Sequence, residues 1–342
     1  LNPGSLTPTG PDSAGIRVQV GSAHTLLNTG SLRVEGSGSA GVLSDSGAVL
    51  TNEGSIFSVS GIGVSFTGSA DTTLINRGSI RGATQAAASG AGNDRLDMQG
   101  GQLTGTVSQG AGNDSLVVSA GTMGAVDQGG GMDSTRILGG TVNGTIQQGA
   151  GIDDFFMSGG EIGALLQGDA LDTFLMTGGR IVGAFDDGDD AVMTGGRIGR
   201  VNMKLDDNTF DMSGGTIDGN LVTGFGHDII RLSEGYIGGN ISVSGGNDAV
   251  SVTGGTVRGE IRLSFGDDLF AWNGGGVIYG AIDLGEGTDI ATLSSLNQSH
   301  LGATPLVDGG AGIDALAFDN VTTDGIAPFR NWESGGGPGD TE

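Results

Sequence analysis

Apolar and polar residues alternate along most of the chain in short runs, and glycine interrupts each run. In RLDMQGG, for example, one polar residue separates Leu96 from Met98, and a Gly-Gly pair follows. Alternation with a period of two over roughly four to six residues is typical of half-buried β-strands, and the glycines mark tight turns. Helix is excluded for these segments, because each glycine within a helix costs about 1 kcal/mol relative to alanine. The pattern therefore predicts an all-β protein built from short strands.

The alternating runs recur with a fixed period. The motif Gly-x-Gly-x-Asp, or a close variant, returns mostly every 19–21 residues between Asp94 and Asp314. Two degenerate copies, DDGDDAVMTGG and KLDDNTFDMSGG, keep the period between Asp172 and Asp228. A unit of about 20 residues cannot bury an apolar face alone, whereas stacked units bury one continuous core. The sequence therefore predicts a single right-handed parallel β-helix, a solenoid with coils of about 20–24 residues.

The first part of the chain repeats differently. Asn28, Asn52 and Asn76 are spaced 24 residues apart, and each is followed two positions later by Gly-Ser. Asparagine tolerates the left-handed conformation of corners, and stacked asparagines can hydrogen-bond in a ladder. We therefore expect longer coils with a 24-residue Asn-Gly repeat at residues 1–85 and coils of about 20 residues at 86–294. Irregular coils and a flexible tail are expected at 295–342.

Composition limits the classes of partner. The 342 residues include 72 glycines, no cysteine, and 39 acidic against 14 basic residues, for a formal charge of -25. This charge disfavours nucleic acid and anionic membranes as partners, because both are bound through clustered lysine and arginine. No apolar run reaches the length of about 18 residues that predicts a membrane span. The lack of cysteine excludes a disulfide framework and suits a protein that crosses an oxidising compartment unfolded.

The repeats carry a family resemblance. Asn-x-Gly-Ser-Ile units, followed by Gly-Gly-x-Ile-x-Gly and Gly-x-Gly-x-Asp coils, resemble the passenger domains of bacterial autotransporters over nearly the whole chain. The segment APFRNWESGG is similar to a step in such passengers. The resemblance implies passage through the periplasm, an outer-membrane β-barrel translocator outside this chain, and display on the cell surface or secretion. It also implies a non-enzymatic adhesin or virulence factor that binds a host extracellular or plasma protein.

A second resemblance concerns the Gly-x-Gly-x-Asp motif itself. RTX calcium repeats read Gly-Gly-x-Gly-x-Asp-x-U-x, where U is a large apolar residue, and GGAGIDALA at 309–317 matches in full. Stacked loops could supply the six to eight oxygen ligands that calcium takes. The candidate ligands are Asp94, Asp114, Asp133, Asp153, Asp228, Asp248, Asp268, Asp289 and Asp314.

Other features disfavour calcium. One glycine of the leading pair is usually replaced, for example by Gln109 or Thr223, and the residue before the aspartate varies. Each aspartate could instead accept backbone N–H groups of its own turn while its side chain reaches solvent. We therefore expect plain corners without a cofactor, and we keep a calcium-stabilised, RTX-like structural surface protein as the alternative.

Candidate functional residues are few. The densest basic cluster, Arg180, Arg197, Arg200 and Lys204, lies in or beside the degenerate zone. Since function concentrates on irregular segments, this cluster is the first candidate for a partner site. Ser46 lies in Asp-Ser-Gly but lacks an evident base, so no catalytic residue is predicted. A polysaccharide-active enzyme is the least favoured alternative, because the chain offers few cations to line a groove for an anionic sugar.

Overall fold

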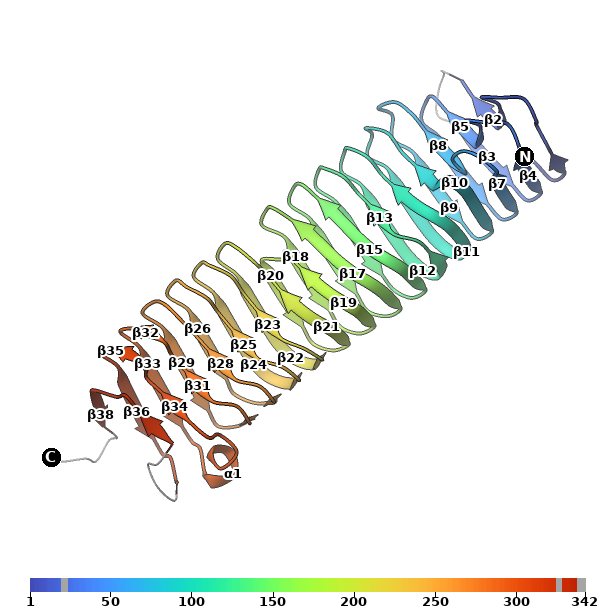
Figure 1. Cartoon of the computed structure of the whole chain (residues 1–342). Helices are drawn as coiled ribbons and strands as arrows, with labels where there is room; N and C mark the ends of the chain where they lie inside the picture. The colour runs from blue at the N-terminus through green and yellow to red at the C-terminus, as the bar shows by residue number, and fades with distance from the viewer. Residues whose placement is uncertain (20–23, 324–327, 337–342) are drawn as a thin grey trace. The chain divides into compact units, whose positions relative to one another are not determined.

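The computed structural model describes residues 1–19, 24–323 and 328–336. It contains two compact units, unit 1 with residues 1–173 and 179–182, and unit 2 with residues 174–178 and 183–342. In each unit the chain winds in successive coils whose strands pair in parallel with those of the next coil (Figure 1). The predicted fold class is confirmed, because the structure is a parallel β-solenoid.

The strands of unit 1 are β1 (Ser5–Leu6), β2 (Ala14–Val18), β3 (His24–Asn28), β4 (Ser31–Val34), β5 (Ala40–Ser44), β6 (Ala48–Asn52), β7 (Ser55–Ser58), β8 (Val64–Phe66), β9 (Thr73–Asn76), β10 (Ser79–Ala88), β11 (Arg95–Ser108), β12 (Ser115–Met123), β13 (Val126–Asp127), β14 (Ser134–Ile137), β15 (Thr141–Gly149), β16 (Asp154–Met157) and β17 (Glu161–Gly168). Residues of both units occur in β18 (Thr173–Met176) and β19 (Arg180–Asp186).

The strands of unit 2 are β20 (Asp190–Met193), β21 (Arg197–Asn202), β22 (Thr209–Ile217), β23 (Leu221–Val222), β24 (Ile229–Ile237), β25 (Ile241–Ser242), β26 (Ala249–Val252), β27 (Thr256–Val257), β28 (Ile261–Arg262), β29 (Leu269–Asn273), β30 (Val277–Ile278), β31 (Ile282–Asp283), β32 (Glu286–Gly287), β33 (Ile290–Ser294), β34 (Val307–Asp308), β35 (Ala311–Gly312), β36 (Ala315–Asp319), β37 (Phe329–Arg330) and β38 (Ser334–Gly336). The helix α1 (Gln298–Leu301) lies between β33 and β34.

Strand register reproduces both sequence periods. In β4, β7 and β10, Ser31 pairs with Ser55 and Ser55 with Ser79, a shift of 24 residues per coil. In β24 and β26, Ile230 pairs with Val250, a shift of 20 residues. The degenerate copy KLDDN keeps the corner, because Lys204 and Asp206 adopt positive φ values of 64° and 75° where other coils carry glycine. The predicted periods are therefore confirmed.

The core includes the residues two and four positions after the corner aspartates. Leu116 and Val118 in unit 1, and Phe270 and Trp272 in unit 2, are all buried. Trp272 keeps its one polar atom satisfied, since Nε1 donates a hydrogen bond to the Gly275 carbonyl at 2.8 Å. The alternation seen in the sequence thus separates core from surface on each strand.

A buried asparagine ladder holds one corner of the N-terminal coils. The Nδ2 group donates to Oδ1 of the asparagine in the next coil, at 2.8 Å from Asn2 to Asn28, 2.8 Å from Asn28 to Asn52 and 2.9 Å from Asn52 to Asn76. The last three residues are the ones whose spacing predicts the ladder, so that prediction is confirmed.

Replacing the middle rung, Asn52→Ala, is expected to lower the free energy of unfolding by about 2–4 kcal/mol. Both of its bonds to neighbouring asparagines disappear, and Asn76 Oδ1 loses its donor inside the coil. Chemical denaturation followed by circular dichroism measures the loss. Asn143→Ala, at an exposed position, is the control and should change stability by less than about 0.5 kcal/mol.

The predicted irregular C-terminal part contains α1, whose Leu301 is buried and which contacts β30. Asn297 caps this helix, accepting a hydrogen bond from Ser299 N at 2.9 Å. None of the described helices is long and apolar enough to span a membrane. The predicted flexible tail falls mostly on residues 337–342, outside the described residues.

Candidate functional site

The aspartate of each Gly-x-Gly-x-Asp corner points into its coil. The side chains of Asp94, Asp114, Asp133, Asp153, Asp172, Asp228, Asp248, Asp268, Asp289 and Asp314 are 0–3% exposed. We call these residues the aspartate column, considered within each unit separately. The prediction that these carboxylates reach solvent is wrong. The reason is that the backbone of the neighbouring coil offers a hydrogen-bond donor on the inner side of the corner.

That donor is the N–H of the residue at the same position in the preceding coil. Asp94 N donates to Asp114 Oδ1 at 2.7 Å, and Asp248 N donates to Asp268 Oδ1 at 2.8 Å. The bond recurs along both units at 2.7–2.9 Å. Backbone N–H groups therefore bind these carboxylates as predicted, but the donor belongs to the neighbouring coil.

In several coils the residue before the aspartate makes the opposite bond. Its exposed side chain accepts a hydrogen bond from the N–H of the next coil, as Asn93 does from Asn113 at 2.8 Å and Asp267 does from Thr288 at 2.9 Å. His227 Nδ1 plays the same part for Asn247 N at 2.9 Å. Asparagine, aspartate and histidine all present an acceptor here, which explains how these three residue types replace one another, whereas Met132, Ile152 and Ile313 present none.

The second carboxylate oxygen of the column is unsatisfied. Buried Oδ2 atoms without a hydrogen-bond partner among the described residues occur in Asp94, Asp114, Asp133, Asp153, Asp228, Asp248, Asp268, Asp289 and Asp314. These nine residues are the ones that the sequence nominates as calcium ligands. A buried charged oxygen without a partner is costly, so each carboxylate must bind a proton or a cation, or remain destabilising.

Burial shifts the protonation of the column. Desolvation raises the pKa of Asp114 and Asp268 to about 7, the N–H bond from the preceding aspartate opposes this, and neighbouring carboxylates raise it further. The same causes raise the pKa of Asp153, Asp248 and Asp289 to about 6. Near neutral pH, the column is therefore partly protonated when no cation is bound.

Glycine carbonyls complete the corner. The Gly92 carbonyl oxygen lies 2.2 Å from where a Cβ on Gly112 would be, and Gly112 has a φ of 128°. Carbonyl and carboxylate oxygens are the ligands that calcium prefers. Among the described residues, no group of three or more histidine, cysteine, aspartate or glutamate side chains could hold a metal ion. A cation at the aspartate column would therefore depend on backbone carbonyls for most of its ligands.

One coil shows that a neutral residue fits the column. Asn208 stands at the aspartate position, and its Nδ2 donates to the Asp206 carbonyl and to Asp228 Oδ1, both at 3.0 Å. Asp248→Asn is therefore expected to raise the melting temperature at about pH 8 in EDTA, by roughly 2–4 °C, because a buried charge is removed. At about pH 5, where Asp248 is already protonated, the two proteins should melt together. A lower melting temperature at both pH values would contradict this interpretation of the column.

The predicted basic cluster is neutralised. Each cation pairs with a carboxylate: Arg180 with Glu161 at 3.4 Å, Arg197 with Asp218 at 2.8 Å, Arg200 with Asp186 at 3.2 Å and Lys204 with Asp187 at 2.5 Å. Arg197 and Arg200 lie on β21 of unit 2, with Lys204 soon after it, whereas Arg180 belongs to unit 1. The cluster stays a predicted partner site, but it offers no excess of positive charge.

Ser46 has no base within reach. The His24 N–H donates to the Gly47 carbonyl at 3.2 Å, which places the two segments side by side. Ser46 Oγ is nevertheless buried without a hydrogen-bond partner among the described residues. Among the described residues, Ser46 Oγ therefore makes no hydrogen bond to a base, which activation of a serine would need.

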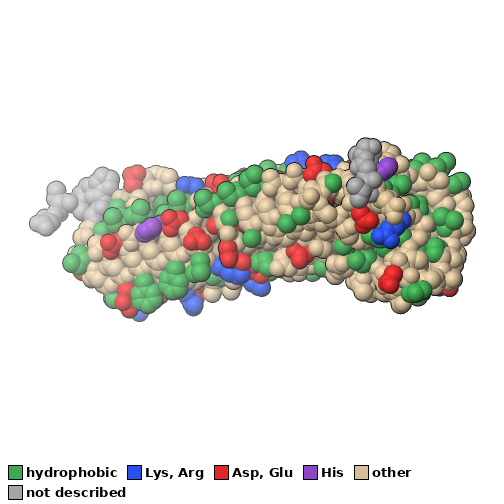
Figure 2. All heavy atoms as spheres, turned by 90° about the horizontal axis from the view of Figure 1, so that it is seen from above, with side chains coloured by type: hydrophobic (Ala, Val, Ile, Leu, Met, Phe, Trp, Pro, Cys, Tyr) green, Lys and Arg blue, Asp and Glu red, His purple; other side chains and the backbone are tan. Residues whose placement is uncertain are grey.

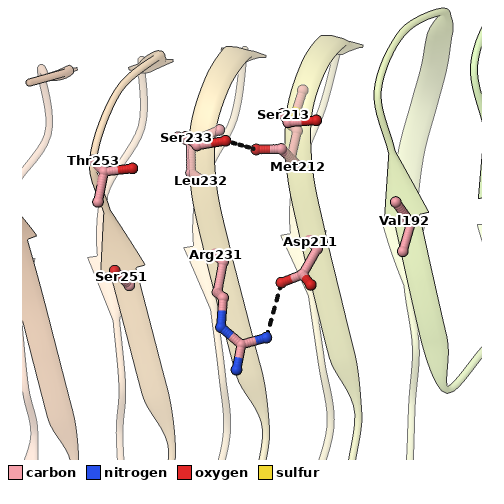
Figure 3. Close-up of a pocket in the computed structure, with 9 residues that line it drawn as sticks. All are labelled: Val192, Asp211, Met212, Ser213, Arg231, Leu232, Ser233, Ser251 and Thr253. Atoms are coloured by element: carbon pink, nitrogen blue, oxygen red, sulfur yellow. Dashed lines mark hydrogen bonds and ion pairs between the residues drawn. The ribbon is translucent and has the colours of Figure 1, made fainter.

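A shallow pocket of about 390 Å³ lies on the outer face of unit 2. Its lining residues are Val192, Asp211, Met212, Ser213, Arg231, Leu232, Ser233, Ser251 and Thr253 (Figure 3). Across it, Arg231 pairs with Asp211 at 3.0 Å, and Ser233 Oγ donates to the Met212 carbonyl at 3.3 Å. The exposed lining of the pocket is mostly apolar, and its two charged side chains are paired with each other.

Sequence reasoning missed the outer edge of the corners in unit 2. We call Leu205, Phe225, Phe265, Leu269, Ile290 and Ile313 the aromatic edge. Their side chains are 45–69% exposed. They occupy the outward positions three before, one before or one after the corner aspartate or its Asn208 counterpart. Figure 2 shows hydrophobic side chains lying among acidic ones on the face in view. The available signal was the central residue of Gly-x-Gly, which is alanine at 91, 111 and 150 but phenylalanine at 225.

No family model and no curated protein matches the chain. The chain is similar to a solved structure described as a hyperactive, Ca²⁺-dependent, β-helical antifreeze protein from an Antarctic bacterium. The two share 21% sequence identity, over 86% of this chain and 83% of that chain, with a TM-score of 0.52. Similarity at this level of identity bears on the fold alone, and in fold this chain is like a β-helical protein.

Proposed function

We propose that this chain is a non-enzymatic autotransporter passenger, secreted or displayed on a bacterial surface, that binds a host extracellular or plasma protein as an adhesin or virulence factor. The observation that supports binding is the aromatic edge. Phe225 and Phe265 stand exposed at a corner position that holds Ala91, Ala111 and Ala150 in coils of unit 1. Clustered exposed apolar residues with a polar surround mark interaction surfaces, and aromatic residues contribute strongly to binding energy.

Affinity capture tests the proposal. The protein is immobilised and exposed to host serum and to cell-surface extract, and each captured protein is then purified and titrated against it. Saturable binding of one purified host protein supports the proposal. Absence of any such protein from both sources contradicts host binding and leaves the coils a structural role.

The aspartate column favours a second candidate, a calcium-stabilised structural surface protein. Nine buried carboxylate oxygens lack a partner among the described residues, and the similar antifreeze protein is described as Ca²⁺-dependent. Where calcium bound, the Oδ2 atoms and corner carbonyls would hold it. The ion would neutralise carboxylates that otherwise repel one another along each unit. Its test is the calcium dependence of stability, argued in the Discussion.

A further inference from the structure

We propose that the aromatic edge of unit 2 binds a cationic amphipathic segment, one that carries apolar side chains together with lysine or arginine. This inference rests on the proposed function and narrows it to a class of protein partner. It depends on the arrangement of the edge, on the absence of its phenylalanines from equivalent coils of unit 1, and on the charges around it.

The side chains of the edge lie in register along successive coils. Isolated β-bridges join Phe225 to Gly245 and Gly245 to Phe265, so these three residues form one column at the outside of the corner. The middle residue has no side chain, and a Cβ on Gly245 would lie 3.3 Å from Phe225 Cδ1. The two phenylalanines thus flank a notch with a backbone floor.

A second column continues the apolar surface onto the adjoining strand. Leu269 pairs with Ile290 across β29 and β33, and both side chains are exposed. Leu269 follows Phe265 by four residues around the same corner. The edge therefore comprises two apolar columns, one before and one after the corner aspartates.

The solenoid does not need these side chains. At the position of Phe225 and Phe265, the coils of unit 1 carry Ala91, Ala111 and Ala150. Those coils form the same corner, with the same column of buried aspartates. Large apolar groups at this position therefore serve something other than folding.

Charge determines the kind of partner. Asp206, Asp207, Asp267 and Glu286 are exposed along the edge. No lysine or arginine occurs from three positions before to one position after each corner aspartate or Asn208, over the described residues 205–315. Lys204 beside them is already paired with Asp187. An apolar surface with a carboxylate surround complements an apolar segment with cations and repels anionic ones.

The same argument disfavours other occupants. A second copy of this chain would bring another charge of -25 to the interface. An anionic membrane would be repelled in the same way. The cationic amphipathic segment is the occupant that both the apolar and the charged groups fit.

The test uses a labelled 18-residue helical peptide of leucine and lysine, titrated by fluorescence anisotropy at about 0.15 M salt. Two further peptides serve as probes. A leucine–glutamate peptide lacks the cations, and a lysine–glutamine peptide lacks the large apolar side chains. Phe225→Ala/Phe265→Ala is the main variant. Met132→Ala/Ile152→Ala is the matched control, because these exposed side chains lie beside corners of unit 1.

The leucine–lysine peptide is expected to bind the wild-type protein, and the phenylalanine variant should weaken binding about tenfold or more. The control variant should stay within about twofold. The melting curve of the phenylalanine variant should coincide with wild type, because alanine is native at the equivalent positions 91, 111 and 150. Asp267→Asn/Glu286→Gln should weaken binding and flatten its salt dependence. Equal loss in both alanine variants, equal binding of the leucine–glutamate peptide, or no binding at all would overturn the proposal.

Failure of this inference is distinguishable from failure of the proposed function. If a purified host protein binds wild type and the phenylalanine variant equally, host binding is supported and the aromatic edge is rejected as its site. If peptide binding requires the phenylalanines but no host protein is captured, the aromatic edge is supported as a binding surface and a host protein as its partner is contradicted.

Discussion

Raising the pH from about 5 to about 8 in EDTA is expected to lower the melting temperature of this protein. The corner aspartates have raised pKa values, about 7 for Asp114 and Asp268 and about 6 for Asp248, against an ordinary value of 3.8. A carboxyl group whose pKa is higher in the folded state stabilises the fold fully below its unfolded pKa. That contribution is lost as the pH rises through the folded pKa. The loss should therefore fall between about pH 4 and pH 7.

The expected size follows from the number of groups. Each unit of pKa shift corresponds to about 1.4 kcal/mol, and several coupled aspartates titrate in each unit of the fold. A combined loss of several kcal/mol corresponds to a fall of roughly 10 °C or more. Circular dichroism melts at a series of pH values measure it. A melting temperature that is flat, or that rises, from about pH 5 to pH 8 in EDTA would show that the carboxyl groups are not buried as described.

Calcium added to the same series separates the two candidate functions. If the column holds calcium, the ion binds the ionised form and should restore the melting temperature at about pH 8, with little effect at about pH 5. Magnesium at equal concentration is the control, because it dehydrates reluctantly and demands a strict octahedral site. Identical melting curves with calcium and magnesium would contradict the calcium-stabilised alternative. Protonation would then be what neutralises the buried carboxylates of the aspartate column.

The fold was largely predictable because its physical causes are local and repeated. Alternation around Leu96 and Met98 defines a strand with one buried face, and recurrence of that pattern requires stacking. The asparagine spacing even predicts which side chains meet, since in-register parallel strands bring equal positions together. Asn28 Nδ2 accordingly reaches Asn52 Oδ1 at 2.8 Å.

The direction of the aspartate side chains was not predictable from the motif. Whether Asp114 faces water or the core depends on where the N–H of Asp94, one coil away, points. The motif alone does not determine the direction of that N–H group. Typical exposure of aspartate argues for the surface, whereas the neighbouring coil supplies the bond that permits burial.

The aromatic edge was missed for a different reason. Phe225 and Phe265 stand at the variable position of a glycine motif, where a comparison with coils carrying Ala111 would have shown them as unusual. The basic cluster was instead predicted as the partner site, because it is the densest group of cations and lies at an irregular segment. The ion pair between Arg200 and Asp186 shows why the spacing of cations alone does not identify a binding surface.

The largest effect of a single substitution is expected at the second glycine of a corner. In Gly246→Ala, the new Cβ would lie 1.7 Å from the Gly226 carbonyl oxygen, at a φ of 135° that side chains rarely adopt. Neither the backbone of Gly246 nor that of the preceding coil can move away without breaking bonds such as the one from Gly226 N to the Gly245 carbonyl. We expect a loss of roughly 3–5 kcal/mol in the free energy of unfolding, measured by chemical denaturation.

Gly245→Ala, one residue earlier, is the matched control. Its Cβ would meet only the exposed Phe225 ring, 3.3 Å from Cδ1, and the Cβ of Phe265 at 3.7 Å. Since Ala91 and Ala111 occupy this position in unit 1, stability should change by less than about 1 kcal/mol. The same added methyl group fills the notch between the two phenylalanines, so Gly245→Ala should alter peptide binding while leaving the fold intact. Equal destabilisation by both substitutions would contradict this explanation, because only Gly246 combines a left-handed φ with a close approach to the neighbouring coil.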